Sequence, residues 1–108
     1  MSEPALLLVL TTLATRDEAL ALGRAMVEAR LAACAQVQAI ASVYRWQGAV
    51  QQDDEWRLLL KCPAARYPAL EAALRAAHPY ELPAIVAVPV VAADAAFAAW
   101  VAAETQGD

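Results

Sequence analysis

His78 is the only histidine in the chain and the first candidate for chemistry. Imidazole is the commonest side-chain ligand for copper and zinc, and Glu81 could add a carboxylate oxygen nearby. Pro79 and Pro83 stiffen this stretch, because proline fixes its own φ and pushes the preceding residue towards extended geometry. We therefore expect residues 78–83 to hold an imidazole, a phenol and a carboxylate in defined directions. The alternative is a rigid helix-to-strand connection with a histidine at the helix end.

Cys34 is a second candidate, either as a metal ligand or as a reactive thiol. Only the thiolate form of cysteine is a good nucleophile or metal ligand, and a buried, inert cysteine is the alternative. Cys34 and Cys62 stand in no metal-binding spacing, so we expect two free thiols in a reducing cytoplasm. With only three glycines and one histidine, the sequence offers no phosphate-binding loop and no catalytic triad, and we expect no enzyme.

The first half of the chain predicts a strand, a helix and a long hairpin. Residues 5–12 are a continuous apolar run of strand length, and Thr15 with Glu18 forms a capping box for a helix that ends near Arg30. Residues 32–50 and 55–62 alternate, which is typical of paired strands, with a turn predicted at residues 51–54. Gly48 is a candidate bulge. The apolar stripe predicted for the helix comprises Leu20, Val27 and Leu31, with Leu22 and Met26 beside them.

The second half predicts a helix, a strand and a final helix. Pro63 can open the first helix, which must end near His78. Residues 84–91 read as a strand that lies at an edge or a bulge because Pro89 cannot donate a ladder hydrogen bond. Asp94 should cap the last helix, and residues 105–108 should fray.

This order, βαββαβ plus a C-terminal helix, predicts an α+β fold of the ferredoxin-like type in a single domain over residues 1–108. Both main helices should cover one face of the sheet. The other face is left open and needs a partner or a ligand to cover it. The side chains predicted on this open face are Cys34, Tyr44, Trp46, Glu55, Arg57 and Lys61.

Composition excludes several partners. The net charge is −4 and the eight basic residues form no run, so we expect neither nucleic acid nor an anionic membrane as a partner. No apolar segment reaches the roughly 20 residues needed to span a bilayer. The acidic start, residues 1–4, lacks the basic region of a signal peptide. Because 29 of the residues are alanine, the core should be modest and oligomerisation more plausible.

Several motifs, in order and over nearly the whole chain, resemble the CutA family of divalent-cation tolerance proteins. They are Leu31-Ala32-Ala33-Cys34, Ser42-Val43-Tyr44-Arg45-Trp46-Gln47-Gly48, Glu55 with Lys61, His78-Pro79-Tyr80-Glu81-Leu82-Pro83, and Trp100. The resemblance implies a ferredoxin-like protomer in a tight cytoplasmic homotrimer, linked to divalent metal tolerance and to copper binding. It also suggests a likeness to trimeric PII-type proteins, so a small-ligand sensor or a regulatory scaffold is the alternative function.

The resemblance implies two kinds of site. His78, Cys34 and Glu81 are the expected ligands for copper or another divalent metal, which folding does not require. Thr11 stands where some members carry a cysteine proposed as a copper ligand, and a hydroxyl is a poor ligand for soft or borderline ions. Aromatic and polar residues could line a cleft between protomers, or else serve as interface anchors and cross-strand pairs. These residues are Tyr44, Trp46, Glu55, Lys61 and Tyr80.

Overall fold

The central strand of the molecule is β1 (Leu6–Leu13), which lies between two antiparallel neighbours. The computed structural model describes residues 5–106 and contains one four-stranded sheet of order β2-β3-β1-β4. The other strands are β2 (Cys34–Trp46), β3 (Ala49–Pro63) and β4 (Val86–Pro89). This strand order is that of a ferredoxin-like sheet, so the predicted fold class is confirmed.

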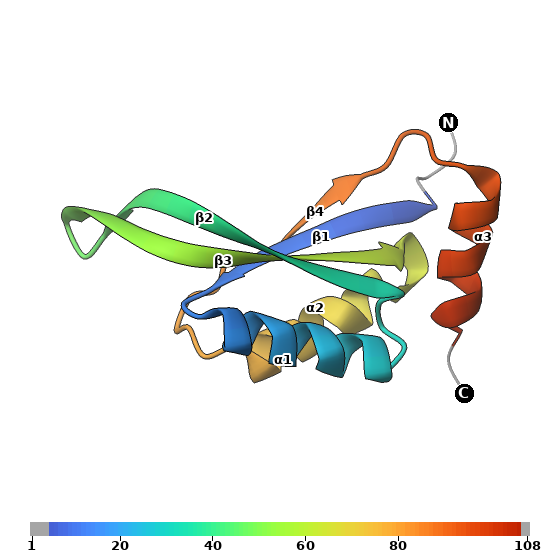
Figure 1. Cartoon of the computed structure of the whole chain (residues 1–108), viewed down its shortest axis with the longest axis horizontal. Coiled ribbons are helices and arrows are strands. Elements are labelled where there is room, and N and C mark those ends of the chain that lie inside the picture. The colour runs from blue at the N-terminus through green and yellow to red at the C-terminus, as the bar shows by residue number, and fades with distance from the viewer. Residues whose placement is uncertain (1–4, 107–108) are drawn as a thin grey trace.

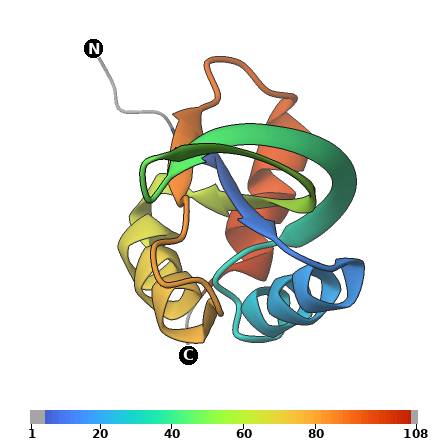
Figure 2. The same cartoon turned by 90° about the vertical axis from the view of Figure 1, so that its left-hand side faces the viewer.

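Two helices cover one face of the sheet, as Figures 1 and 2 show. They are α1 (Arg16–Glu28) and α2 (Tyr67–Ala77), the latter preceded by a short 3₁₀ turn at Ala64–Arg66. The third helix, α3 (Ala95–Glu104), lies across one end of the sheet, near the start of β1 (Figure 1). The opposite end carries the long β2–β3 hairpin, which projects beyond the helices.

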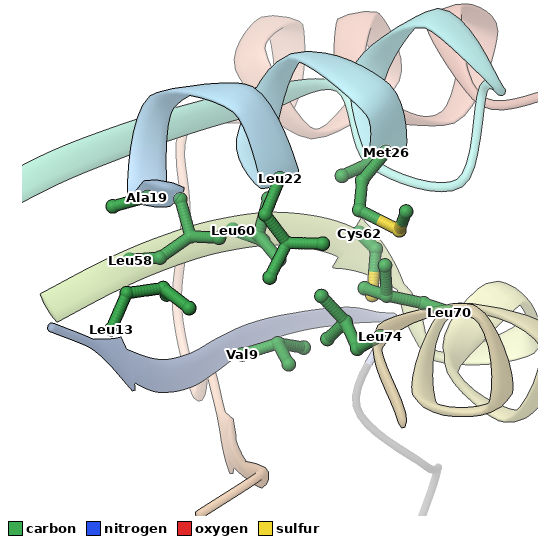
Figure 3. Packing of buried hydrophobic residues seen from close by; sticks show 11 residues of the cluster. Val9, Leu13, Ala19, Leu22, Met26, Leu58, Leu60, Cys62, Leu70 and Leu74 are labelled. Atoms are coloured by element: carbon green, nitrogen blue, oxygen red, sulfur yellow. The ribbon is translucent and has the colours of Figure 1, made fainter. Parts of the chain in front are cut away.

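The main core lies between the sheet and the two helices (Figure 3). Side chains of alternate residues on β1 and β3 point towards α1 and α2, as the period of two in a strand requires. Gly23 allows α1 to approach the sheet closely, since a Cβ there would stand 2.9 Å from the Cβ of Ala35. The largest contributors to the core include Val9, Leu13, Leu22, Met26, Leu58, Leu60, Leu70 and Leu74.

The start of α1 agrees with the prediction, but its buried stripe is different. The Thr15 hydroxyl accepts a hydrogen bond from the Glu18 backbone N–H at 3.1 Å and caps the helix. Leu22 and Met26 are buried, whereas Leu20 is 42% exposed, so its predicted place in the stripe is wrong. The small residues Ala19 and Gly23 occupy the buried positions instead, because the helix packs close to the sheet.

The hairpin turn lies at Gln47 and Gly48, and the turn predicted at residues 51–54 is wrong. Both turn residues have positive φ, 50° and 81°, which is typical of the tight two-residue turn whose twist matches the strands. Gly48 is therefore a turn residue rather than a bulge. Asp53 and Asp54 belong to β3, where they pair with Ser42 and Ala41.

The second half of the chain differs from the prediction at its boundaries. The helix α2 ends at Ala77 with His78 as its cap residue, as expected. The last strand is shorter than predicted, Val86–Pro89, and it pairs with β1 at the edge of the sheet. Thr105, expected to fray, is buried and donates a hydrogen bond to the Val101 carbonyl at 2.7 Å. Residues 1–4 and 107–108 lie outside the described residues.

The open face of the sheet carries an apolar centre with polar flanks. The strand register aligns Leu8 and Leu10 of β1 with Val88 and Val86 of β4, and the two valines are 42% and 51% exposed. On the other side of β1, Leu8 and Leu10 face Lys61 and Leu59 of β3. The second half of β2 and the first half of β3 pair with each other beyond the end of β1 and carry most of the polar residues. At the α3 end this face is covered, since Leu6 is buried with Val101.

Candidate functional site

His78 is only 8% exposed, and both of its ring nitrogens have partners. Nδ1 accepts a hydrogen bond from the Tyr80 backbone N–H at 3.1 Å, and Nε2 lies 3.0 Å from the Thr11 Oγ1. In a neutral imidazole one nitrogen donates and the other accepts, so the ring carries its proton on Nε2 and donates it to Thr11. A metal ion at this side chain would have to replace one of these two hydrogen bonds.

Burial lowers the pKa of His78 below its usual 6.5. The Thr12 backbone and the carboxylates of Glu18 and Glu55 act in the opposite direction. Burial dominates because it penalises the charged imidazolium. The side chain is therefore neutral at pH 7 and fixes the position of the Tyr80 backbone.

Tyr80 links His78 to the open side of the sheet. Its hydroxyl donates a hydrogen bond to the Glu55 carboxylate at 2.8 Å, and its ring lies 4.9 Å from the imidazole, centre to centre. Burial and the Glu55 carboxylate raise the pKa of Tyr80, so the phenol is neutral. Tyr80 thus links two sides of a line of contacts: its backbone N–H bonds to His78, which contacts Thr11, and its hydroxyl bonds to Glu55.

This line ends in a pocket of about 700 Å³ at the base of the β2–β3 hairpin. Tyr44 and Trp46 reach it from β2, Glu55 from β3, and Tyr80 and Glu81 from the connection before β4. Four of the five residues predicted to line a cleft thus meet in one pocket of a single chain. The remaining lining residues are Thr12, Ala41, Ser42, Val43, Leu82 and Ala84.

Tyr44 is held in the pocket wall by a second carboxylate. Its hydroxyl donates a short hydrogen bond to the Asp53 carboxylate. This hydrogen bond, followed by partial burial and the charges of Asp53 and Glu55, raises the pKa of Tyr44. Asp53 was assigned to a turn by the sequence, so its role in positioning this aromatic ring was missed.

Lys61 and Cys34 lie together, but away from this pocket. They are directly paired between β3 and β2, towards the α3 end of the sheet. The Lys61 ammonium donates a hydrogen bond to the Gln36 side chain at 3.0 Å and lies 5.6 Å from the centre of the Phe97 ring. Lys61 is therefore separated from the other four residues predicted for the cleft.

The predicted metal ligands do not converge in one protomer. Within residues 5–106, no group of three or more His, Cys, Asp and Glu side chains could hold a metal ion. Thr11, the partner of His78, is aligned across the sheet with Leu58 and Val37, whose side chains face the helices. Cys34 is an odd number of residues from Val37 on β2, so its side chain points to the other face. Cys34 and His78 are thus on opposite faces of the sheet.

Both cysteines are free thiols, as expected. Cys34 is partly exposed, whereas Cys62 is fully buried in the main core. Burial raises the pKa of Cys62 to about 11, so this thiol is protonated and inert at pH 7. Cys62 therefore has a packing role.

Sequence reasoning missed Thr11 as the partner of His78, although a signal was present. Thr11 lies between Val9 and Leu13 on the buried side of β1 and is 1% exposed. A hydroxyl at a core position must find a hydrogen-bond partner. That requirement could have directed attention to the single histidine.

The fold and this site define a ferredoxin-like α+β protein with an aromatic, acidic pocket at the base of a long hairpin. A sequence model described as CutA1 divalent ion tolerance protein matches residues 7–104. The chain belongs to this family. No helix within residues 5–106 is long and apolar enough to cross a membrane.

Individual relatives support this assignment. The divalent-cation tolerance protein CutA of Thermus thermophilus is 39% identical over 98 residues, which cover 90% of this chain and 95% of that protein. The human protein CutA is 36% identical over 79% of this chain, but the chain spans only 48% of the human protein. The structure of CutA from Synechococcus elongatus superposes with a TM-score of 0.93 at 36% identity, covering 98% of this chain and 95% of that one.

Proposed function

We propose that this protein is a cytoplasmic homotrimer that contributes to divalent-cation tolerance through weak binding of copper or another divalent metal. The family match over residues 7–104 carries this proposal, because the relatives across that length are named for divalent-cation tolerance. The proposal includes no catalytic step. It assigns His78, Cys34 and Glu81 as the metal ligands.

The arrangement of these ligands supports weak rather than tight binding. His78 already donates to Thr11 and accepts from Tyr80, so a metal ion must compete with two existing hydrogen bonds. Cys34 faces the other side of the sheet, so a site that used both residues would need ligands from more than one protomer. Specific sites for zinc or copper need three or four ligands, which a trimer could supply by repetition.

The open face of the sheet supports oligomerisation. Val86 and Val88 are half-exposed on this face and continue the row of Leu10 and Leu8 on β1. Exposed apolar surface of this kind is typical of a surface that contacts a partner. Three copies of the chain whose open faces turn towards a common three-fold axis would cover this apolar surface, as in a closed cyclic homotrimer.

Copper titration tests the metal proposal. Protein purified without tags or chelators would be titrated with copper in competition with a chromogenic chelator, alongside His78→Ala and Glu81→Gln. Glu104→Gln is the matched control because it removes the same charge from the exposed end of α3. We expect His78→Ala to weaken copper binding at least about tenfold, as the loss of a ligand should. Equal affinity in the wild type and His78→Ala would reject His78 as a ligand.

A PII-like small-ligand sensor is the second candidate function, and the pocket beneath Tyr44 and Tyr80 favours it. Ligand pockets usually measure about 300–1,000 Å³ and combine apolar walls with a few polar groups, as this one does. A thermal-shift screen of metabolites in metal-free buffer would test this function. Clear metal binding without stabilisation by any small molecule would favour the first candidate.

A further inference from the structure

The aromatic lining of the pocket comes from two separate segments. Tyr44 and Trp46 lie at the outer end of β2, and Tyr80 lies in the connection that follows α2. In the single chain Tyr44 and Trp46 are 41% and 38% exposed, so the rest of the protomer does not cover their rings. Tyr44 and Tyr80 are fixed by hydrogen bonds to Asp53 and Glu55, which leaves their positions defined before any ligand arrives.

The charge of the pocket has one sign. Glu55 and Glu81 contribute carboxylates to the wall, and the described residues that line it include no Lys, Arg or His. Only one oxygen of Glu55 accepts the Tyr80 hydroxyl, so its other oxygen remains available as an acceptor. The carboxylate of Asp53 accepts the Tyr44 hydroxyl and adds to the negative charge near the pocket.

We propose that this pocket binds a small organic cation of the alkylammonium class, held between the aromatic rings of Tyr44, Trp46 and Tyr80 and the carboxylates of Glu55 and Glu81. This inference rests on the second candidate function, the small-ligand sensor, and names the class of its ligand. Aromatic faces carry negative charge density and attract ammonium groups, and surrounding carboxylates reinforce that attraction.

Other ligand classes suit the pocket less well. An anion would meet two carboxylates and no basic side chain among the lining residues. A hard divalent cation such as Ca²⁺ or Mg²⁺ prefers to be surrounded by oxygen ligands, whereas the rings of Tyr44, Trp46 and Tyr80 form much of this wall. An alkylammonium group has both the charge that Glu55 and Glu81 favour and the apolar surface that the rings favour.

Paired ligands of equal shape test the proposal. Choline and its uncharged analogue 3,3-dimethylbutan-1-ol would be titrated by calorimetry into the full-length protein after treatment with a chelator. The variants are Glu81→Gln and Trp46→Leu, with Glu104→Gln as the charge-matched control. Circular dichroism and mass in solution would verify that each variant retains its fold and assembly.

We expect choline to bind about tenfold more tightly than the uncharged analogue, because only the cation gains from the rings and carboxylates. Glu81→Gln and Trp46→Leu should each weaken choline binding severalfold, and Glu104→Gln should not. Equal binding of the two compounds, no binding of either, or unchanged affinity in Glu81→Gln would overturn the proposal. No metal is present in this experiment, so its failure would not affect the result of the copper titration of His78.

Discussion

Nε2 of His78 lies 3.0 Å from the hydroxyl oxygen of Thr11, although 67 positions separate the two residues in the sequence. This contact joins the end of α2 to the middle of the central strand inside the core. The same histidine accepts the Tyr80 backbone N–H and thereby positions a ring of the pocket. These two hydrogen bonds of His78 thus connect the core of the protein with its candidate ligand site.

We predict that Thr11→Val destabilises the protein by about 1–3 kcal/mol, because it leaves the buried Nε2–H of His78 without an acceptor. The double variant Thr11→Val with His78→Phe should lose less than the sum of the two single changes, since both polar partners are removed together. Urea denaturation of the four proteins at one protomer concentration measures this coupling. Strict additivity would show that the hydrogen bond contributes nothing.

The lowered pKa of His78 predicts a loss of stability in mild acid. Below pH 6.5 the unfolded chain binds a proton at this residue while the folded chain does not, so stability falls as the pH falls from 6.5 towards the folded-state pKa. Above pH 6.5 this contribution is complete and constant. Urea midpoints measured across this window should fall more steeply for the wild type than for His78→Phe. Parallel profiles would contradict the prediction.

Gly23→Ala should be destabilising even though alanine favours helices by up to about 1 kcal/mol over glycine. The new Cβ would stand 2.9 Å from the Cβ of Ala35 and 3.0 Å from Cδ1 of Leu58. Overpacking of a tight core costs about 1–3 kcal/mol. The cost of Gly23→Ala should therefore be smaller in an Ala35→Gly background, which removes the nearer atom. Thermal or urea unfolding of the four combinations measures this difference.

The open sheet face predicts the behaviour of the protein in solution. Light scattering should give three times the protomer mass for the wild type at micromolar concentration. Val88→Glu introduces a charge on the apolar part of this face and should shift the mass towards the monomer. Val91→Glu is the control, because Val91 lies beyond β4 and is 97% exposed. A stable wild-type monomer would refute the trimer and any site that depends on it.

The order of strands and helices could be predicted from the sequence because apolar periodicity is strong wherever an element packs on the core. The hairpin turn could not be placed, because both faces of the β2–β3 extension beyond Ser42 are exposed and carry little periodic signal. Polar residues at 51–54 resembled a turn, while the real turn, Gln47-Gly48, lacks the asparagine that usually marks one. Whether a polar side chain on a strand is buried depends on the neighbouring elements of the fold rather than on the sequence of that strand.

The candidate site could be predicted in part, again because side chains alternate between the two faces of a strand. Tyr44, Trp46 and Glu55 share the face that alternation predicted for them, and they meet in one pocket. Tyr80 lies in a connection without strand periodicity, so its place in the cleft was expected from the family resemblance and not from alternation. Lys61 is separated from the pocket because it lies further along β3 than Glu55. Assigning a residue to one face of the sheet does not say how far along the strand it lies. The engagement of both His78 nitrogens depends on contacts with Thr11 and Tyr80, which only the folded chain brings together.

The projecting β2–β3 hairpin offers a way to follow the assembly of the protein in solution. Residues 43–50 are all exposed in the single chain, and an isolated two-stranded ribbon is only marginally stable in water. Its backbone amides should therefore exchange with deuterium quickly in a single chain, and more slowly in the proposed trimer where a neighbouring chain packs against the hairpin. The tip of the hairpin would thus report on assembly through hydrogen–deuterium exchange and mass spectrometry, without an attached dye or tag.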